Sequence, residues 1–180
     1  MADPGGTGAR GLIGGLLERE RRFLARLEGV LSFDRAIYRE IENDPHAIPQ
    51  AIAVVVVTAA LAALGQGSLV SIFVGLGGVI VLWMAATGLI WAVGQVSVGT
   101  SFDFSKLLRC SGFAYAWFAL LLFASLPVLG SFFAWAALVL ALASLVIATR
   151  EVIDTDTSRA ALICAVALGV PLIVLVWLGA

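Results

Sequence analysis

Histidine and cysteine are nearly absent from this sequence, which has one His and two Cys. The chain therefore has too few of these side chains to build a metal centre or a disulfide framework from them. We expect His46 to be a surface residue and Cys110 and Cys164 to be small packing residues or sites of lipidation. No catalytic, cofactor-binding or metal-binding residue is predicted, no cofactor is expected, and the protein is predicted not to be an enzyme or to bind nucleic acid.

Charged residues are also scarce. They make up 13% of the chain, whereas hydrophobic residues make up 61%; a soluble domain has roughly 25% charged residues. The core of one small domain cannot bury so many hydrophobic side chains, so we expect the protein to be embedded in a membrane. The first strongly apolar run begins near Ile48, too late for a cleavable signal peptide. We expect that run to remain as an uncleaved anchor.

Five apolar runs approach the length of about 20 residues that a spanning helix requires. They cover residues 48–65, 69–94, 107–126, 128–149 and 160–178. The short joints at residues 66–68 and 127–130 favour antiparallel neighbours. The predicted fold class is therefore an all-α membrane protein, a five-transmembrane-helix bundle over residues 48–180.

The charged residues are segregated along the chain. Seven arginines precede the first predicted span, and the other basic residues lie in or beside the second and fourth connections. The acidic residues follow the same division, and the first and third connections have no charged side chain. The positive-inside rule then predicts an N-terminus in the cytoplasm and a C-terminus on the opposite side of the cytoplasmic (inner) membrane.

The segment before the spans divides in two. Residues 1–10 are rich in Gly and lack apolar periodicity, which predicts disorder. Residues 11–47 are predicted to form cytoplasmic amphipathic helices, because apolar residues recur at helical spacing over 12–31 and again over 33–42. The basic helix either lies on membrane lipids, docks on a partner helix, or caps the bundle. Its candidate contact residues are Arg19, Arg21, Arg22, Phe23, Arg26 and Leu27.

Ionisable residues are missing from the centres of the predicted spans, where proton relays and ion pathways usually need them. The hydroxyl groups there, such as those of Thr58, Thr87 and Ser144, can bond to their own helix backbone. A permease or channel for a small neutral solute would need these groups to line a polar path. It is the least favoured of the functions considered.

Small residues form two stripes suited to close helix packing in lipid. One lies on the second predicted span and includes Gly78, Ala85 and Gly88. The other lies on the fourth and includes Ala137, Ala141 and Ser144. We expect these stripes to pack a compact bundle, although one of them can instead receive another membrane protein or a second copy of this chain.

Three segments carry a likeness to a known family. They are IYREIENDP at residues 37–45, FSKLLRCSGFAYA at 104–116 and ATREVID at 148–154. With the five closely spaced spans, they make residues 33–178 resemble the Yip1 family in its short prokaryotic form. One departure is Trp117, where members commonly have a proline. The Ala, Gly and Arg bias is typical of a bacterial source.

The resemblance implies a fold and a class of function. Eukaryotic members of the family are associated with early secretory trafficking, Rab GTPase binding and membrane shaping. We therefore expect a non-enzymatic scaffold or adaptor that binds other proteins or shapes the membrane, with an accessory subunit of a larger membrane complex as the alternative. The resemblance also implies a polar cluster that ties three spans together, although an ordinary excess of charge at an inside face explains it equally well; its residues are Arg109, Arg150, Glu151 and Asp154.

Overall fold

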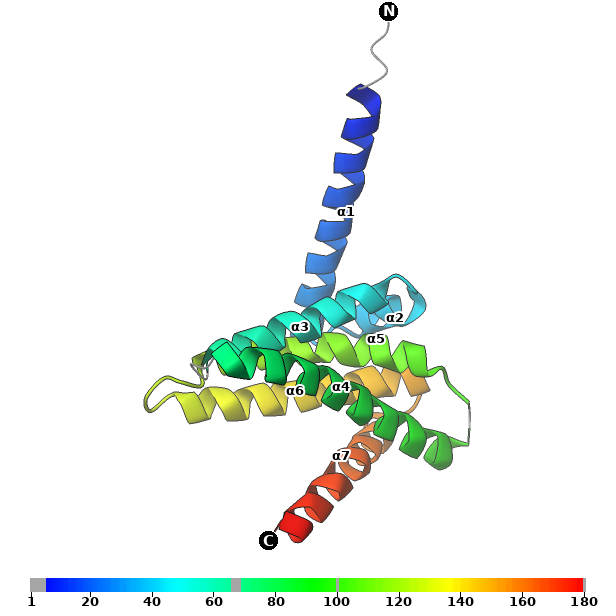
Figure 1. The fold of residues 1–180 in the computed structure, drawn as a ribbon. Helices are drawn as coiled ribbons and strands as arrows, with labels where there is room; N and C mark the ends of the chain where they lie inside the picture. The colour runs from blue at the N-terminus through cyan, green and yellow to red at the C-terminus, as the bar shows by residue number, and fades with distance from the viewer. Residues whose placement is uncertain (1–5, 66–68, 100, 180) are drawn as a thin grey trace, which may run out of the picture.

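The computed structural model describes the backbone of residues 6–65, 69–99 and 101–179, and the side chains within these ranges except those of residues 6–13, 16, 65, 69–76 and 170–179. All the described elements are helical (Figure 1). In chain order they are α1 (Gly6–Leu31), α2 (Arg35–Asn43), α3 (Ala47–Gly65), α4 (Leu69–Val98), α5 (Phe104–Ala114), the 3-10 helix η1 (Tyr115–Phe123), α6 (Gly130–Ile153) and α7 (Thr157–Gly179).

Helices α3, α4, α5 and α6 lie lengthwise beside one another and form the body of the bundle (Figure 1). Helix α7 packs against α4 and α6 and then diverges from them. Helix α1 projects from the side of the bundle, across the direction of the long helices. The short helix α2 folds back against α5 and α6, so it belongs to the bundle rather than to a separate N-terminal domain.

Four helical stretches among the described residues are long and apolar enough to cross a membrane. They are Ala47–Leu64, Gly77–Val98, Phe104–Phe123 and Gly130–Ile153. Helix α7 is apolar over Thr157–Gly169, the part whose side chains are described. The structure is therefore that of an all-α protein with at least four candidate membrane spans.

The third of these stretches has an unexpected conformation. Its first part, α5, is an α-helix of 11 residues, and its second part, η1, is a 3-10 helix of 9 residues. Runs of 3-10 helix this long are uncommon, because their hydrogen-bond geometry is poorer. With rises of 1.5 Å and 2.0 Å per residue, the two parts together extend about 34 Å, enough to cross a bilayer core of about 30 Å.

Local signals set several helix ends. The side chain of Asp103 accepts a hydrogen bond from the backbone nitrogen of Ser105 at 2.9 Å and so caps the start of α5. The side chain of Asp34 caps α2 in the same way through Ala36. Gly99 follows α4 with φ of 71°, the left-handed conformation in which glycine commonly ends a helix.

Helix α1 begins earlier than the sequence analysis predicted. Gly6 is its first residue, so residues 6–10, which we expected to be disordered, are helical. Residues 1–5 of that segment lie outside the described residues. Glycine lowers helix stability by only about 1 kcal/mol, and the chain has no proline between Pro4 and Pro45 to end a helix.

The interior of the bundle combines large apolar side chains with a few bonded polar groups. Trp83 is almost fully buried, and its indole nitrogen donates to Ser111 Oγ at 3.0 Å. Thr87 Oγ1 lies 2.9 Å from the same hydroxyl oxygen, so the bonds join α4 to α5. A Cβ added at Gly112 would lie 2.7 Å from the Cβ of Ala51. Glycine therefore lets α5 approach α3 closely at this position.

Candidate interaction site at the polar end of the bundle

The charged residues gather at one end of the bundle, which we call the polar end. It comprises α2, residues 44–46, residues 99 and 101–103, and residues 154–156, with the adjoining helix turns. Ion pairs link α2 to the long helices there. Arg39 Nε lies 2.8 Å from a carboxylate oxygen of Glu151 in α6, and Lys106 Nζ of α5 lies 2.8 Å from Glu42 Oε1.

Tyr38 strengthens the attachment of α2 from within. Its side chain is fully buried, and its hydroxyl group is hydrogen-bonded to Ser144 of α6. Burial raises the pKa of this hydroxyl well above its ordinary value, against the opposing effect of the Ser144 bond. The thiol of Cys110 donates to the backbone oxygen of Tyr38 at 3.5 Å. Helix α2 is thus held by side chains from both α5 and α6.

Arg26 joins α1 to the rest of the polar end. Its residue exposure is 3%, although it belongs to a helix that projects from the bundle. The guanidinium donates to Glu40 Oε1 at 2.8 and 2.9 Å, to Asp44 Oδ2 at 2.6 Å and to Gln50 Oε1 at 2.7 Å. One side chain of α1 therefore contacts α2, the turn after it and the first part of α3.

Electrostatic effects in this group are consistent with stable ion pairs. The hydrogen bond from Arg26 lowers the pKa of Asp44, even though partial burial acts to raise it. Burial acts to lower the pKa of Arg26, but the bonds to Asp44 and Glu40 outweigh this effect and the pKa is raised. Both shifts favour the charged forms, so Arg26 and Asp44 remain ionised at neutral pH.

The predicted contact surface on α1 needs correction at Arg26. We expected it to face headgroups or a partner with Arg19, Arg21 and Arg22; these three are exposed, but Arg26 points inward. The reason is that Glu40, Asp44 and Gln50 supply acceptors which the sequence pattern of α1 alone does not reveal. Phe23 and Leu27 also turn inward, since both are half-buried and pack on the core.

The outward side of α1 carries an apolar row that we call the leucine row. It consists of Leu17, Leu24 and Leu31, whose exposures are 54%, 62% and 43%. At about 100° per residue, all three lie within about 40° of the direction opposite Arg26. By the same count Arg19 and Arg22 lie within about 40° of the Arg26 direction. Arg19, Arg22 and Arg26 thus lie on the side of α1 toward the polar end and the leucine row lies away from it, with the exposed residues Arg21 and Glu28 beside the leucine row.

The predicted polar cluster is assembled only in part. Arg150 Nε lies 3.9 Å from the buried Glu151 carboxylate, and Arg150 Nη1 donates to Thr157 Oγ1 of α7 at 3.0 Å. Asp154 is exposed and ends α6 in a left-handed conformation, with φ of 52°. Arg109 is buried, but its Nε donates to the backbone oxygen of Ser105, within its own helix.

Sequence reasoning therefore missed Arg39, which supplies the short ion pair to Glu151. Arg109 takes no part in an ion pair among the described residues. A buried carboxylate at a span end requires a cation. That rule points to some arginine, but several candidates stand close in sequence, and only the packing of α2 selects Arg39.

The two small-residue stripes have different surroundings. Ala137, Ala141 and Ser144 are buried, so the stripe on α6 packs inside the bundle. The stripe on α4 does not, because Gly78 and Ala85 are exposed. A Cβ added at Gly78 or Gly88 would meet no atom within 4 Å. Packing within the chain is thus the wrong expectation for α4, and contact with a second subunit stays a prediction.

No group of three or more potential metal ligands occurs among the described residues. His46 is exposed, while Cys110 and Cys164 are free thiols that are both buried. In comparisons with family models, curated proteins and solved structures, the chain matched none. The features of the molecule that bear on function are therefore the polar end and the orientation of α1.

Proposed function

We propose that this protein is a non-enzymatic, five-span membrane scaffold of the Yip1 type that shapes the cytoplasmic leaflet through α1. The observation that carries the proposal is the orientation of α1, which is fixed at Arg26 and presents the leucine row on its opposite side. The resemblance in residues 33–178 supports the same class of function.

The topology follows from the charge distribution. The charged residues of the described chain gather at the polar end and on α1, which under the positive-inside rule makes that end cytoplasmic. Helix α7 runs from Thr157 to Gly179, a length of 23 residues that suffices for a fifth span. With five spans the C-terminus lies on the opposite side of the inner membrane.

In this orientation α1 lies in the cytoplasmic interface. Arg19 and Arg22 face headgroups and water, the leucine row faces hydrocarbon, and the long side chains of Arg21 and Glu28 beside that row extend to the headgroups. A helix inserted into one leaflet widens that leaflet alone and so favours curvature. The bundle prevents α1 from leaving the membrane, because Arg26 and Phe23 attach its C-terminal half to α2, α3 and α5.

The first test locates α1 in the membrane. Cysteines introduced by Leu24→Cys and Arg22→Cys are labelled with an environment-sensitive dye in vesicles that contain spin-labelled lipids. We expect quenching by chain-labelled lipid to be strong at position 24 and weak at position 22, since these positions lie on opposite sides of α1. Both native thiols are buried and should react slowly.

The second test asks whether the protein shapes membranes. The purified full-length protein is reconstituted into vesicles with anionic lipid, and vesicle diameter is measured by electron microscopy. We expect tubules or smaller vesicles with the wild type and none with the Leu17→Glu/Leu24→Glu variant. Equal quenching at positions 22 and 24, or equal vesicle shapes for both proteins, would contradict the proposal.

The alternative function is that of an accessory subunit in a larger membrane complex. It is favoured by the open stripe on α4, where Gly78 and Gly88 leave room for a helix of another protein or of a second copy. After mild solubilisation, purification through an N-terminal tag would then recover a partner in constant ratio to this protein. Replacing Gly78 with Ile should abolish that recovery.

The permease hypothesis is not favoured, because the hydroxyls it needs are already bonded. Thr58 donates to the backbone oxygens of Val54 and Val55. Thr87 donates to the backbone oxygen of Trp83, and Ser144 is bonded to Tyr38. These groups leave little hydrogen-bonding capacity for a passing polar solute.

A further inference from the structure

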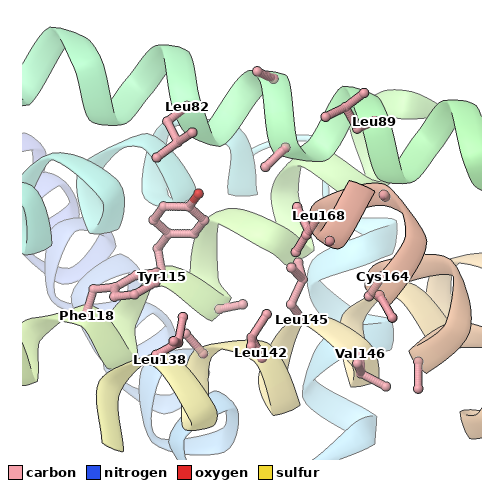
Figure 2. Close-up of a pocket in the computed structure, with 18 residues that line it drawn as sticks. Leu82, Leu89, Tyr115, Phe118, Leu138, Leu142, Leu145, Val146, Cys164 and Leu168 are labelled. Carbon is pink, nitrogen blue, oxygen red and sulfur yellow. The ribbon is translucent and has the colours of Figure 1, made fainter. Parts of the chain in front are cut away.

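A cavity of about 600 Å³ lies between α4, η1, α6 and α7 (Figure 2). It is of the size usual for small-molecule sites, about 300 to 1,000 Å³. Leucine and alanine side chains form most of its wall. Among the residues that line it none is charged, so the cavity offers an apolar environment.

The cavity opens to the side of the bundle rather than to either end. Leu82 and Leu89 of α4 and Leu138 of α6 line it and are themselves exposed, with Leu82 at 63%. All three lie well inside candidate membrane spans. The medium at the opening is therefore lipid hydrocarbon, and a void open to it fills with hydrocarbon chains.

The size of the cavity identifies one kind of occupant. A cavity of this volume holds one molecule of small-ligand size. Ordered water needs two to four polar partners, which these walls do not provide. A single flexible chain does fit.

One polar atom marks a specific position in this apolar wall. The hydroxyl oxygen of Tyr115 points toward α4 near Leu82 (Figure 2), and no hydrogen bond to it is found among the described residues. The side chain of Tyr115 is half-buried, and a hydroxyl group that faces hydrocarbon without a partner is unfavourable. The other polar group of the wall, the thiol of Cys164, already lies 3.3 Å from Thr149 Oγ1. The occupant therefore supplies an acceptor to Tyr115 alone.

From these features we propose that the cavity binds one long-chain lipid whose carbonyl or hydroxyl oxygen accepts a hydrogen bond from Tyr115. The chain lies against the small side chains of α4, α6 and α7, including Ala85, Ala141 and Ala165. This inference goes beyond the scaffold function, because the site lies away from α1 and does not depend on its position.

The test uses the full-length protein in phosphatidylcholine vesicles that contain a trace of a long-chain ketone bearing a diazirine beside the carbonyl. After irradiation, the labelled peptides are identified by mass spectrometry. We expect labels to concentrate on the residues that line the cavity. Ala85→Phe, alone or with Ala165→Phe, places aromatic rings in the cavity and should abolish this labelling. Val81→Phe is the matched control, since Val81 is 67% exposed and lies outside the cavity wall.

A second comparison examines the hydrogen bond. An alkane probe of equal length should compete with the ketone, and the wild type should prefer the ketone by roughly three- to tenfold, the value of one net hydrogen bond. Tyr115→Phe should remove this preference while labelling of the cavity continues. Gel filtration and circular dichroism establish that each variant is folded. If the double variant is not folded, the labelling test is made with Ala85→Phe or Ala165→Phe alone.

Two results would overturn the proposal. One is labelling spread evenly over outward-facing residues such as Val57 and Val139, which are 55% and 59% exposed. The other is equal labelling of the Ala85→Phe and Val81→Phe proteins. A ketone preference that survives in Tyr115→Phe would refute the assignment of the hydroxyl as the donor.

Discussion

Replacing Arg26 with alanine should loosen α1 from the bundle and lower the stability of the whole protein. The change removes all four hydrogen bonds that Arg26 makes to Glu40, Asp44 and Gln50. It also leaves two carboxylates without their cation. Because they belong to α2 and to the turn before α3, their mutual repulsion acts on the junction that positions α1.

The size of the effect follows from exposure. Removing one partner of a fully buried ion pair costs about 3 to 5 kcal/mol, whereas exposed pairs contribute about 0 to 1 kcal/mol. The side chain of Arg26 is 4% exposed, but those of Glu40 and Asp44 are 50% and 29% exposed and can regain water. We therefore expect Arg26→Ala to cost about 2 kcal/mol. Arg26→Lys keeps the charge without the planar fork and should cost about half of that.

The assay is unfolding in mixed micelles by titration with dodecyl sulfate, followed by tryptophan fluorescence. Arg22→Ala is the matched control, because Arg22 is exposed one turn earlier on the same helix. Its loss should change the free energy of unfolding by less than about 0.5 kcal/mol. Equal midpoints for the Arg26→Ala and Arg22→Ala proteins would refute the idea that Arg26 fixes α1.

Three further predictions concern other contacts at the polar end and in the core. Because the pKa of Asp44 is lowered in the folded state, its contribution to stability is present above the unfolded pKa and is lost as the pH falls below about 4. Acid titration of the unfolding midpoint should show this loss in the wild type and not in Asp44→Asn. A double-mutant cycle on Arg39→Ala and Glu151→Gln should give a coupling of about 1 kcal/mol, since the guanidinium is 68% exposed and the carboxylate 4% exposed. Gly112→Val should lower the melting midpoint in detergent by an amount equivalent to about 1 to 3 kcal/mol, because its side chain would overlap Ala51.

Much of the bundle was predictable because apolar length is a strong signal. The four candidate spans of the structure overlap four of the runs identified in the sequence, and α7 covers the fifth run. The helix cap at Asp103 was also readable, since it depends on neighbours two residues away. The 3-10 conformation of Tyr115–Phe123 was not, because nothing in that apolar run distinguishes it from an α-helix.

The arginines show where sequence reasoning reaches its limit. Helical spacing places Arg26 at the edge of the apolar side of α1, next to Phe23 and Val30, where either water or the bundle could surround it. A charge normally favours water. Whether Arg26 is buried depends on Glu40 and Asp44, which lie beside it because α2 folds back against the bundle. The partner of Glu151 was missed for the same reason.

The contacts of α2 explain why the position of α1 is tied to that of the spans. Arg39, Lys106 and Tyr38 attach α2 to α5 and α6, and Arg26 attaches α1 to the far end of α2 and to α3. A tilt of the long helices would therefore move the acceptors of Arg26, and α1 would move with them. The reverse also holds, because coupling between two parts of a protein is reciprocal. A displacement of the leucine row, by lipid or by a partner, would therefore act on the polar end of the bundle through Arg26. Arg26→Ala should separate these motions while leaving the leucine row itself unchanged.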